Sequence, residues 1–402
     1  MRQLSVQTDS GITMSLIYLD NQATTPTDPR VVEAMLPFLG VGAVGNPHSE
    51  HFAGRRAEAA VEGARAQIAD LIGARPEEII FTSGATEANN IALQGIARSS
   101  QRRGNHVVTC ASEHQCVLDT GRYLEQNGFQ VTHLPVDRNG LVTAADLSIA
   151  LREDTALVSV MSANNEIGVL QPVGELAEIC RSRRIVFHTD AAQLFGKLAL
   201  NVRELGVDLM SLSGHKLYAP IGIGALFVSE ASPVVPEPIS FGGGQERGIR
   251  SGTIAPHLCV AFGAAATIAK HELVADAAAA MHLRARFLEI VRASLPDVLV
   301  NGEDAPRLPG NLSLTIPGVD ADRLVGTVQP DVAVSTNAAC SSGTLTPSHV
   351  LLALGIGEEA AASTLRIGFG RFNTMAEVEI AAERLSHAAL RIKGESASSF
   401  AA

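Results

Sequence analysis

Val207-Asp208-Leu209-Met210-Ser211-Leu212-Ser213-Gly214-His215-Lys216 is an apolar run that ends in a glycine turn and a lysine. Such a run is typical of a buried strand, and the turn places Lys216 at the carboxyl end of that strand. A lysine that a pocket keeps deprotonated is a nucleophile toward carbonyl compounds, with which it forms an imine. A solvated surface lysine is the alternative for this stretch taken alone.

Two further apolar runs also end at residues with a chemical use. Residues 185–189 lead into Asp190, and a carboxylate at the end of a central strand can hold the protonated ring nitrogen of pyridoxal phosphate (PLP). Asp190 is equally suited to cap the next helix. Residues 81–87, Phe-Thr-Ser-Gly-Ala-Thr-Glu, end a strand and begin a helix, whose N–H groups either bind phosphate or serve in ordinary capping. An amine, an acid and a phosphate-binding helix start are together typical of a PLP enzyme.

The order of the elements indicates an α/β fold with two domains. Short β-rich runs alternate with helical stretches between residues 107 and 228, which predicts a mostly parallel sheet. From about residue 260 the pattern changes to an alanine-rich helix, short strands and a final helix. We therefore expect an N-terminal extension (1–16), a large PLP-binding domain (17–262), a smaller α+β domain (263–393) and a disordered tail (394–402).

These motifs and others make the chain similar to the NifS/IscS-type cysteine desulfurases of the class V aminotransferase family. The matching segments follow the family's order and are residues 18–26, 45–47, 82–87, 113–115, 164–168, 188–193, 213–216, 242–253, 339–342 and 365–372. The resemblance implies the type I fold of PLP-dependent transferases. It also implies a reaction in which L-cysteine becomes L-alanine and its sulfur passes through the enzyme to an acceptor protein.

The resemblance implies catalytic roles for three residues of the large domain. Lys216 would hold PLP as an imine, be displaced by the substrate, and then move protons at the substrate α-carbon. Asp190 would hold the pyridinium proton. His114 would stack on the cofactor ring and transfer a proton, which suits a side chain that titrates near neutral pH, although a histidine in a surface loop is the alternative for His114 alone.

The same resemblance implies further contacts to cofactor and substrate. Gln193 would bind the phenolic oxygen of PLP, and the remaining cofactor contacts would be Ala85, Thr86, Asn165, Ser213 and His215. Arg366 would bind the substrate carboxylate with both of its terminal nitrogens, helped by Asn46 and Asn165. A lone arginine beside a strand is otherwise a surface ion-pair partner.

The glycine-rich segment Arg247 to Thr253 is implied to reach into a neighbouring subunit. Thr253 would touch the phosphate bound by that subunit, so a homodimer would be needed for activity. From the residues alone, the segment indicates only a flexible loop.

Cys110, Cys180 and Cys259 are predicted core residues, Cys116 stays open because it is two residues from His114, and Cys340 is the reactive candidate. The five cysteines show neither a CxxC pair nor the spacing of metal ligands, so we expect no disulfide framework and no metal site. Cys340 stands out because residues 336–344 around it are small and polar, which predicts an exposed, mobile loop. By resemblance, Cys340 is the nucleophile that takes up the substrate sulfur as a persulfide, and His114 is the candidate base for its thiol.

Two departures from the family pattern leave the sulfur acceptor open. Gln245 stands where many relatives have histidine, and residues 337–343 read Asn-Ala-Ala-Cys-Ser-Ser-Gly in place of a Gly-Ser-Ala-Cys-Thr-Ser pattern. The acceptor protein could serve iron–sulfur cluster assembly, tRNA thiolation or DNA phosphorothioation. The length of segment 334–348 favours the long-loop, IscS-like branch of the family.

Two other functions are consistent with these residues. A selenocysteine lyase, or another class V lyase, would keep Lys216, Asp190 and Arg366 without requiring Cys340. A non-catalytic scaffold of the same fold is expected to lose the lysine or the aspartate, and both are present.

Composition and charge are those of a soluble globular protein. The chain has 402 residues, of which 46% are hydrophobic and 18% charged, enough for two domains with substantial cores. Its net charge of −11 argues against direct nucleic-acid binding. We see no apolar run of membrane length and no signal-peptide pattern, so we expect a cytoplasmic protein without membrane contact.

Overall fold

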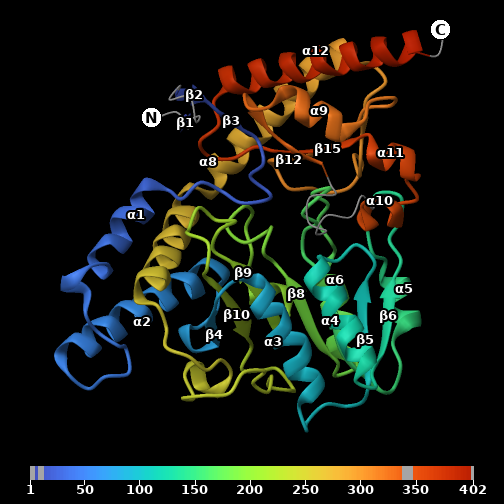
Figure 1. The fold of residues 1–402 in the computed structure, drawn as a ribbon. Helices are drawn as coiled ribbons and strands as arrows, with labels where there is room; N and C mark the ends of the chain where they lie inside the picture. Colours follow the sequence, from blue (N-terminus) through green and yellow to red (C-terminus); the bar gives the residue numbers. More distant parts are fainter. Residues whose placement is uncertain (1–4, 8–12, 337–346, 400–402) are drawn as a thin grey trace.

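The computed structural model describes residues 5–7, 13–336 and 347–399 (Figure 1). A seven-stranded sheet with helices on both faces forms the large domain, in the lower part of the view. A smaller antiparallel sheet with its own helices lies above it. The predicted α/β architecture, with a mostly parallel sheet and a smaller second domain, is confirmed.

The large sheet explains the continuous apolar runs of the sequence. In this sheet β10 runs in the direction opposite to that of the other six strands. Every strand except the edge strand β6 is buried along its whole length, because helices cover both faces. In sheet order the strands are β4 (Ile79–Thr82), β10 (Gly224–Val228), β9 (Leu209–Ser213), β8 (Val186–Asp190), β7 (Thr155–Ser159), β5 (His106–Cys110) and β6 (Gln130–Leu134).

Alternate strand residues face two different helix layers. α3 and α4 share one apolar core with one face of the sheet, and α2, α5, α6 and α7 share another with the opposite face. The helices of this domain are α1 (Pro29–Met35), α2 (Phe52–Ile72), α3 (Ala85–Arg98), α4 (Gln115–Gln126), α5 (Ala144–Ala150), α6 (Val173–Ser182) and α7 (Val202–Leu205). Short 3₁₀ turns are found at Leu36–Phe38, Val41–Ala43, Pro76–Glu78 and Glu246–Gly248.

The small domain is built on the antiparallel sheet β11-β12-β15-β14. Its strands are β11 (Leu299–Val300), β12 (Asn311–Thr315), β15 (Thr364–Gly368) and β14 (Ser335–Thr336), and its helices are α9 (Ala321–Val328), α10 (His349–Ala353), α11 (Glu358–Ala362) and α12 (Met375–Ser399). β3 (Ile17–Tyr18) pairs in parallel with β13 (Val332–Ala333). β1 (Ser5–Gln7) pairs with β2 (Thr13–Ser15).

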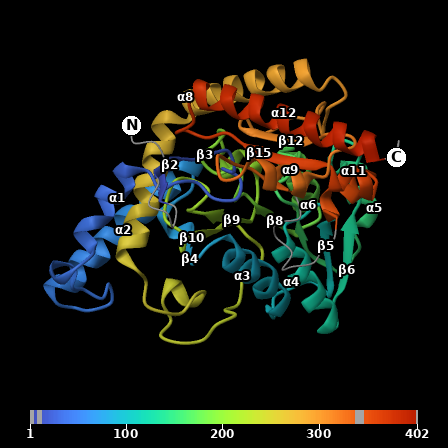
Figure 2. The same ribbon diagram turned by 45° about the horizontal axis from the view of Figure 1, so that its top comes forward.

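Helix α8 (Pro256–Ser294) crosses from one domain to the other. Figure 2 shows it passing beside α12, with which it is in contact. Its residues 259–269 belong to the core of the large domain, and its residues 283–291 to the core of the small domain. The predicted boundary at 262 was therefore too early, because the helical pattern continues unbroken through the change of core.

Both ends of the chain also differ from the predicted boundaries. Ile17 and Leu19 belong to the core of the small domain, although the prediction placed them in the large one. Residues 394–399 continue α12, so the prediction of a disordered tail was wrong for them. An existing helix is extended at low cost through residues such as Glu395 and Ala397, because the nucleation step has already occurred.

The alanine-rich composition of α8 makes it apolar enough to span a membrane by length and composition alone. It has 39 residues, and its most apolar 18-residue window has a mean hydropathy of 1.4. The prediction of no such segment was wrong in this respect. Within the described residues, however, α8 contributes buried side chains to both apolar cores, which is the behaviour of a core helix.

Arg371 joins the small domain to the loop that carries Lys216. Its Nη1 and Nη2 donate to Asp28 Oδ2 at 2.9 Å and to Asp276 Oδ2 at 2.7 Å. Its guanidinium lies 4.5 Å from the ring centre of Tyr218, whose hydroxyl accepts a hydrogen bond from the Arg371 N–H. Burial opposes ionisation of Asp28, but Arg30 and then Arg371 lower its pKa to about 2. The site loop is thus fixed by a buried charge network.

We expect Arg371→Met to destabilise the protein, because it leaves the buried Asp28 carboxylate without one of its partners. The expected loss is about 3 kcal/mol of unfolding free energy, measured by urea denaturation. Arg384→Met is the matched control, since Arg384 pairs with Asp331 at the surface. That change should cost less than about 1 kcal/mol, and equal losses in the two variants would contradict the prediction.

Candidate active site

One cavity of about 390 Å³ lies where the loops at the carboxyl ends of the parallel strands meet. Such an edge is the usual ligand site of an open α/β sheet. Strand β15 of the small domain contributes Arg366 from the other side. The predicted site residues that line this cavity are Ala85, Thr86, His114, Asn165, Asp190, Gln193, Ser213, His215, Lys216 and Arg366.

Two predicted site residues in the described part of the chain, Asn46 and Thr253, are not brought to this cavity. Asn46 lies in the segment between the 3₁₀ turn Val41–Ala43 and α2. It is exposed, and its Oδ1 accepts a hydrogen bond from the His48 N–H at 3.0 Å. Thr253 is exposed and does not line the cavity of its own chain. Cys340 lies outside the described residues.

Lys216 is positioned by the main chain around it. Gly214 lets the loop turn tightly after β9, since a Cβ there would lie 2.7 Å from Ile223 Cγ2. The Lys216 Nζ donates to the main-chain carbonyls of Gln22 and Ala23, at 2.7 Å for Ala23. Main-chain carbonyls keep their place, so the amine is held at a defined point of the cavity wall.

Asp190 is oriented by a residue that the sequence analysis did not single out. Its Oδ2 accepts a hydrogen bond from Asn89 Nδ2 at 2.6 Å, and its Oδ1 accepts from the Ala192 N–H at 2.9 Å. Asn89 is fully buried on α3 among apolar neighbours. A polar residue on the apolar face of a helix was the available signal. The two bonds keep the carboxylate from rotating.

The start of α3 offers hydrogen-bond donors to an anion. Its first residues Ala85 and Thr86 line the cavity, and the first turn of a helix has main-chain N–H groups without helical partners. Strand β10 passes close behind, because a Cβ on Gly224 would lie 2.6 Å from Gly84 Cα. Ser213 Oγ is buried without a hydrogen-bond partner among the described residues. The geometry suits a phosphate group.

His114 is a neutral ring at the wall of the cavity. Burial lowers its pKa, although the charge of Asp190 acts in the opposite direction. Its Nδ1 accepts a hydrogen bond from the Cys116 N–H at 3.2 Å, and Cys116 Sγ lies 3.1 Å from the same atom. The proton of the neutral ring therefore belongs on Nε2.

Arg366 presents part of its guanidinium to a ligand. Its side chain is 4% exposed, and Nη2 donates to Asp20 Oδ1 at 3.0 Å. Its Nε is buried and has no hydrogen-bond partner within the described part of the chain. A buried donor without a partner is costly, so this group is suited to receive a carboxylate.

Comparison with known proteins agrees with this geometry. The family model described as "Aminotransferase class-V" matches residues 17–380. The chain belongs to the class-V aminotransferase family.

Relatives within that family carry a more specific name. A protein named "Cysteine desulfurase" from Mus musculus is 48% identical over 389 residues, covering 96% of this chain and 84% of the relative. "Cysteine desulfurase IscS" from Rickettsia akari is 50% identical over 366 residues, covering 91% and 89%. A solved structure described as "NIFS-LIKE PROTEIN" has a TM-score of 0.85 and 34% identity, covering 92% of this chain and 98% of its own.

Membership of the class-V family implies PLP, and the residues of the cavity fit it. The cavity provides an amine at Lys216, an oriented carboxylate at Asp190 and a helix start with the unpartnered Ser213 hydroxyl. These match the aldehyde, ring nitrogen and phosphate of the cofactor. Within the described residues, no group of three or more His, Cys, Asp or Glu side chains could hold a metal ion.

Glu113, next to His114, makes the stability of the folded protein depend on pH. It is fully buried, and its Oε1 accepts a hydrogen bond from the Met161 N–H at 2.6 Å. Burial, and then the charge of Asp190, raise its pKa to about 8. The neutral acid is therefore favoured in the folded protein. The stability that protonated Glu113 contributes is fully present below the pKa that this side chain has in the unfolded protein. It is lost as pH rises through about 8.

We expect Glu113→Gln to abolish this loss of stability at high pH, because glutamine resembles the protonated acid at every pH. Its stability advantage over the wild type should grow from mildly acid to mildly alkaline solution, reaching roughly 3–5 kcal/mol. Thermal unfolding across that pH range measures it. Glu383→Gln, at an exposed position on α12, is the control and should give a flat difference. A flat difference for Glu113→Gln would refute the prediction.

Proposed function

We propose that this protein is a PLP-dependent cysteine desulfurase, which converts L-cysteine to L-alanine and transfers the sulfur to Cys340 as a persulfide. One observation carries the proposal. Lys216, Asp190 and Arg366 converge on a single cavity in a chain that is 48–50% identical to cysteine desulfurases over more than nine-tenths of its length. A non-catalytic scaffold has no need for this convergence.

The cavity residues bind and orient the cofactor and the amino acid. When bound, PLP supplies an aldehyde and an electron-withdrawing ring that stabilises negative charge at the α-carbon. Asp190 holds the proton of the ring nitrogen, and the helix start of α3 with Ser213 and His215 binds the phosphate. Gln193 contacts the phenolic oxygen. Burial, and then Lys216, lower the pKa of His215 to about 4, so His215 is a neutral hydrogen-bonding partner there.

Arg366 and Lys216 act on the substrate itself. Arg366 binds the carboxylate of L-cysteine with its unpartnered Nε and one terminal nitrogen, and Asn165 contacts the same molecule. Lys216 accepts the α-proton at Nζ and returns it to the carbon skeleton. His114 holds a proton at Nε2 beside these groups and exchanges it during the reaction.

Sulfur transfer needs no external oxidant. The Cys340 thiolate attacks the substrate sulfur and forms an S–S bond, while the electron pair of the Cβ–S bond returns to the carbon fragment. That fragment takes up a proton and leaves as alanine. The persulfide then passes its outer sulfur to an acceptor protein, for which iron–sulfur assembly, tRNA thiolation and DNA phosphorothioation are the candidate pathways. The cytoplasm is the proposed location.

Mass spectrometry of Cys340 tests this function. After incubation with L-cysteine, the peptide that contains Cys340 should gain the mass of one sulfur atom, and Cys340→Ala should show no such gain while keeping the visible absorbance of the cofactor. The peptides of the other four cysteines are internal controls. Equal alanine production by Cys340→Ala and the wild type would instead favour a lyase that does not use this cysteine.

We also propose an obligatory homodimer in which Thr253 completes the partner's site. The loop that carries it is well defined in the chain. Arg65 and Glu246 form a buried pair at 2.8 Å, and Arg250 Nε donates to Glu87 Oε1 at 2.9 Å near the start of α3. Thr253 itself is exposed. A loop that is anchored by these pairs and ends in an exposed residue is suited to reach a second subunit.

Hybrid dimers test the role of Thr253. Lys216→Ala lacks the amine, so its turnover should fall by about 10²–10⁴-fold, and Thr253→Ala should bind PLP more weakly. If Thr253 acts across the interface, a mixed dimer of the two variants contains one intact site, and activity returns on mixing. If Thr253 acts within its own chain, or not at all, mixing restores no activity.

A further inference from the structure

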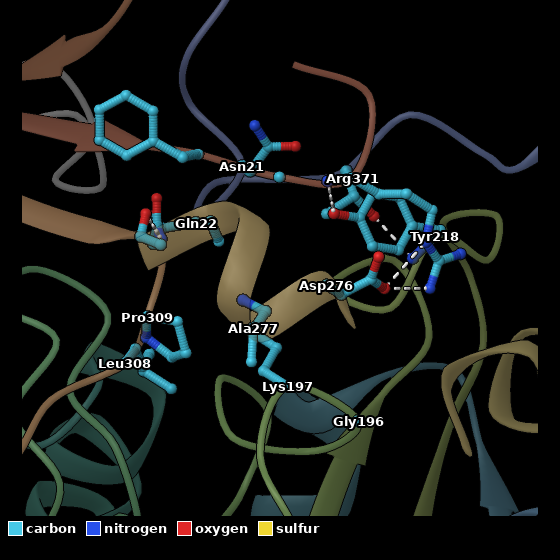
Figure 3. A pocket seen from close by; sticks show the side chains of 15 residues that line it. Asn21, Gln22, Gly196, Lys197, Tyr218, Asp276, Ala277, Leu308, Pro309 and Arg371 are labelled. Carbon is cyan, nitrogen blue, oxygen red and sulfur yellow. Dashed lines mark hydrogen bonds and ion pairs between the residues drawn. The ribbon is translucent and has the colours of Figure 1, made fainter. Parts of the chain in front are cut away.

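A second lysine, Lys197, lies behind the proposed cofactor site. It borders a separate cavity of about 40 Å³ between the two domains. Figure 3 shows Lys197 with Gln22, Leu308 and Pro309 on one side and Tyr218, Asp276 and Arg371 on the other. Gly196 has φ +67°, a left-handed conformation that glycine adopts without strain, and it directs the chain into this position.

Lys197 contacts a residue of the proposed cofactor site. Its Nζ donates to Gln193 Oε1 at 3.1 Å. The other end of that amide, Nε2, donates to the main-chain carbonyl of Gln22 at 2.9 Å, and the same carbonyl accepts from Lys216. Gln193 is 4% exposed and lines the larger cavity. A continuous chain of hydrogen bonds therefore connects the two lysines through Gln193.

The charge of Lys197 decides how the Gln193 amide can lie. An ammonium group has only donors, so it requires the carbonyl end of the amide to face it. The NH₂ end then donates one hydrogen to the Gln22 carbonyl, and its second hydrogen is available to an oxygen of the cofactor. A neutral amine can also accept a hydrogen bond, so it no longer opposes the reversed amide, and only the Gln22 carbonyl does.

We propose that Lys197 is a positioning residue, which holds the Gln193 amide with its NH₂ end toward the phenolic oxygen of the cofactor. The inference rests on the proposed function, because it assumes that PLP occupies the larger cavity. It assigns a role in the reaction to a residue that lies outside that cavity.

The surroundings of Lys197 allow its charge to change near neutral pH. Burial, and then the positive charge of Lys216, lower the pKa of Lys197 to about 7. The titratable and charged groups that face it are His215 and Lys216 on the loop after β9, Tyr218, Asp276 on α8 and Arg371 after β15. The ammonium is present below about pH 7 and lost above it, so the hold on Gln193 weakens in alkaline solution.

Three proteins loaded with PLP test the proposal by their visible absorption on the acid and alkaline sides of neutrality. The visible absorption of the wild type should change with pH. Lys197→Met should show the spectrum of the alkaline wild type at both pH values. Lys197→Arg, which stays charged, should show the spectrum of the acid wild type at both. Lys197→Met should also bind PLP about 2–10-fold more weakly, the effect of one misplaced hydrogen bond. Lys270→Met, at an exposed lysine paired with Asp70, is the control and should match the wild type.

The outcomes separate this proposal from its alternatives. A merely structural role for Lys197 predicts a lower melting temperature with unchanged absorption and affinity, and that result would overturn the inference. Identical spectra for Lys197→Met and the wild type at both pH values would overturn it as well. A wild-type protein that binds no PLP would instead remove the proposed function, and this inference with it.

Discussion

The hydrogen bonds from Lys216 Nζ to the carbonyls of Gln22 and Ala23 are the constraint around which the site is arranged. The turn that supplies these carbonyls is also tied to the small domain. Asn21 Nδ2 donates to the Gly368 carbonyl at 2.8 Å, two residues beyond Arg366. One short turn therefore sets the positions of both the amine and the guanidinium. Main-chain carbonyls accept hydrogen bonds at every pH, so the acceptors that position Nζ are always present.

Burial determines how the charged groups of the site behave. Asp190, Arg366 and Asp28 are each largely removed from water, and each has a partner that compensates for the lost hydration. Among the cavity residues, Gln22 Oε1, Ser213 Oγ and Arg366 Nε have no partner within the described part of the chain. Leaving such atoms unsatisfied is costly in a folded protein, and a ligand that meets them recovers that cost on binding. The same burial disfavours charge on Glu113 and Lys197.

The residues at strand ends could be predicted because their position follows from local pattern. An apolar run that stops at Asp190 or at Ser213 marks the edge of a buried parallel sheet, and all such edges meet at one place. The domain boundary could not be predicted in this way, because α8 keeps its helical pattern while its surroundings change from one core to the other. Asn89 and Lys197 were missed because each acts through another residue, and pattern does not show such contacts.

The sequence by itself determined the alternation of strands and helices, the loops at which the catalytic candidates lie, and the resemblance to a PLP-dependent family. The strands, helices and loops follow from the order of apolar and polar residues along the chain, which depends on near neighbours, whereas the resemblance rests on the motifs and their order. Only the tertiary structure decided that Asn46 and Thr253 stay away from the cavity of their own chain, that Arg366 enters it from a second domain, and that two lysines are linked through one amide. Such relations join residues far apart in the chain, and packing alone brings them together.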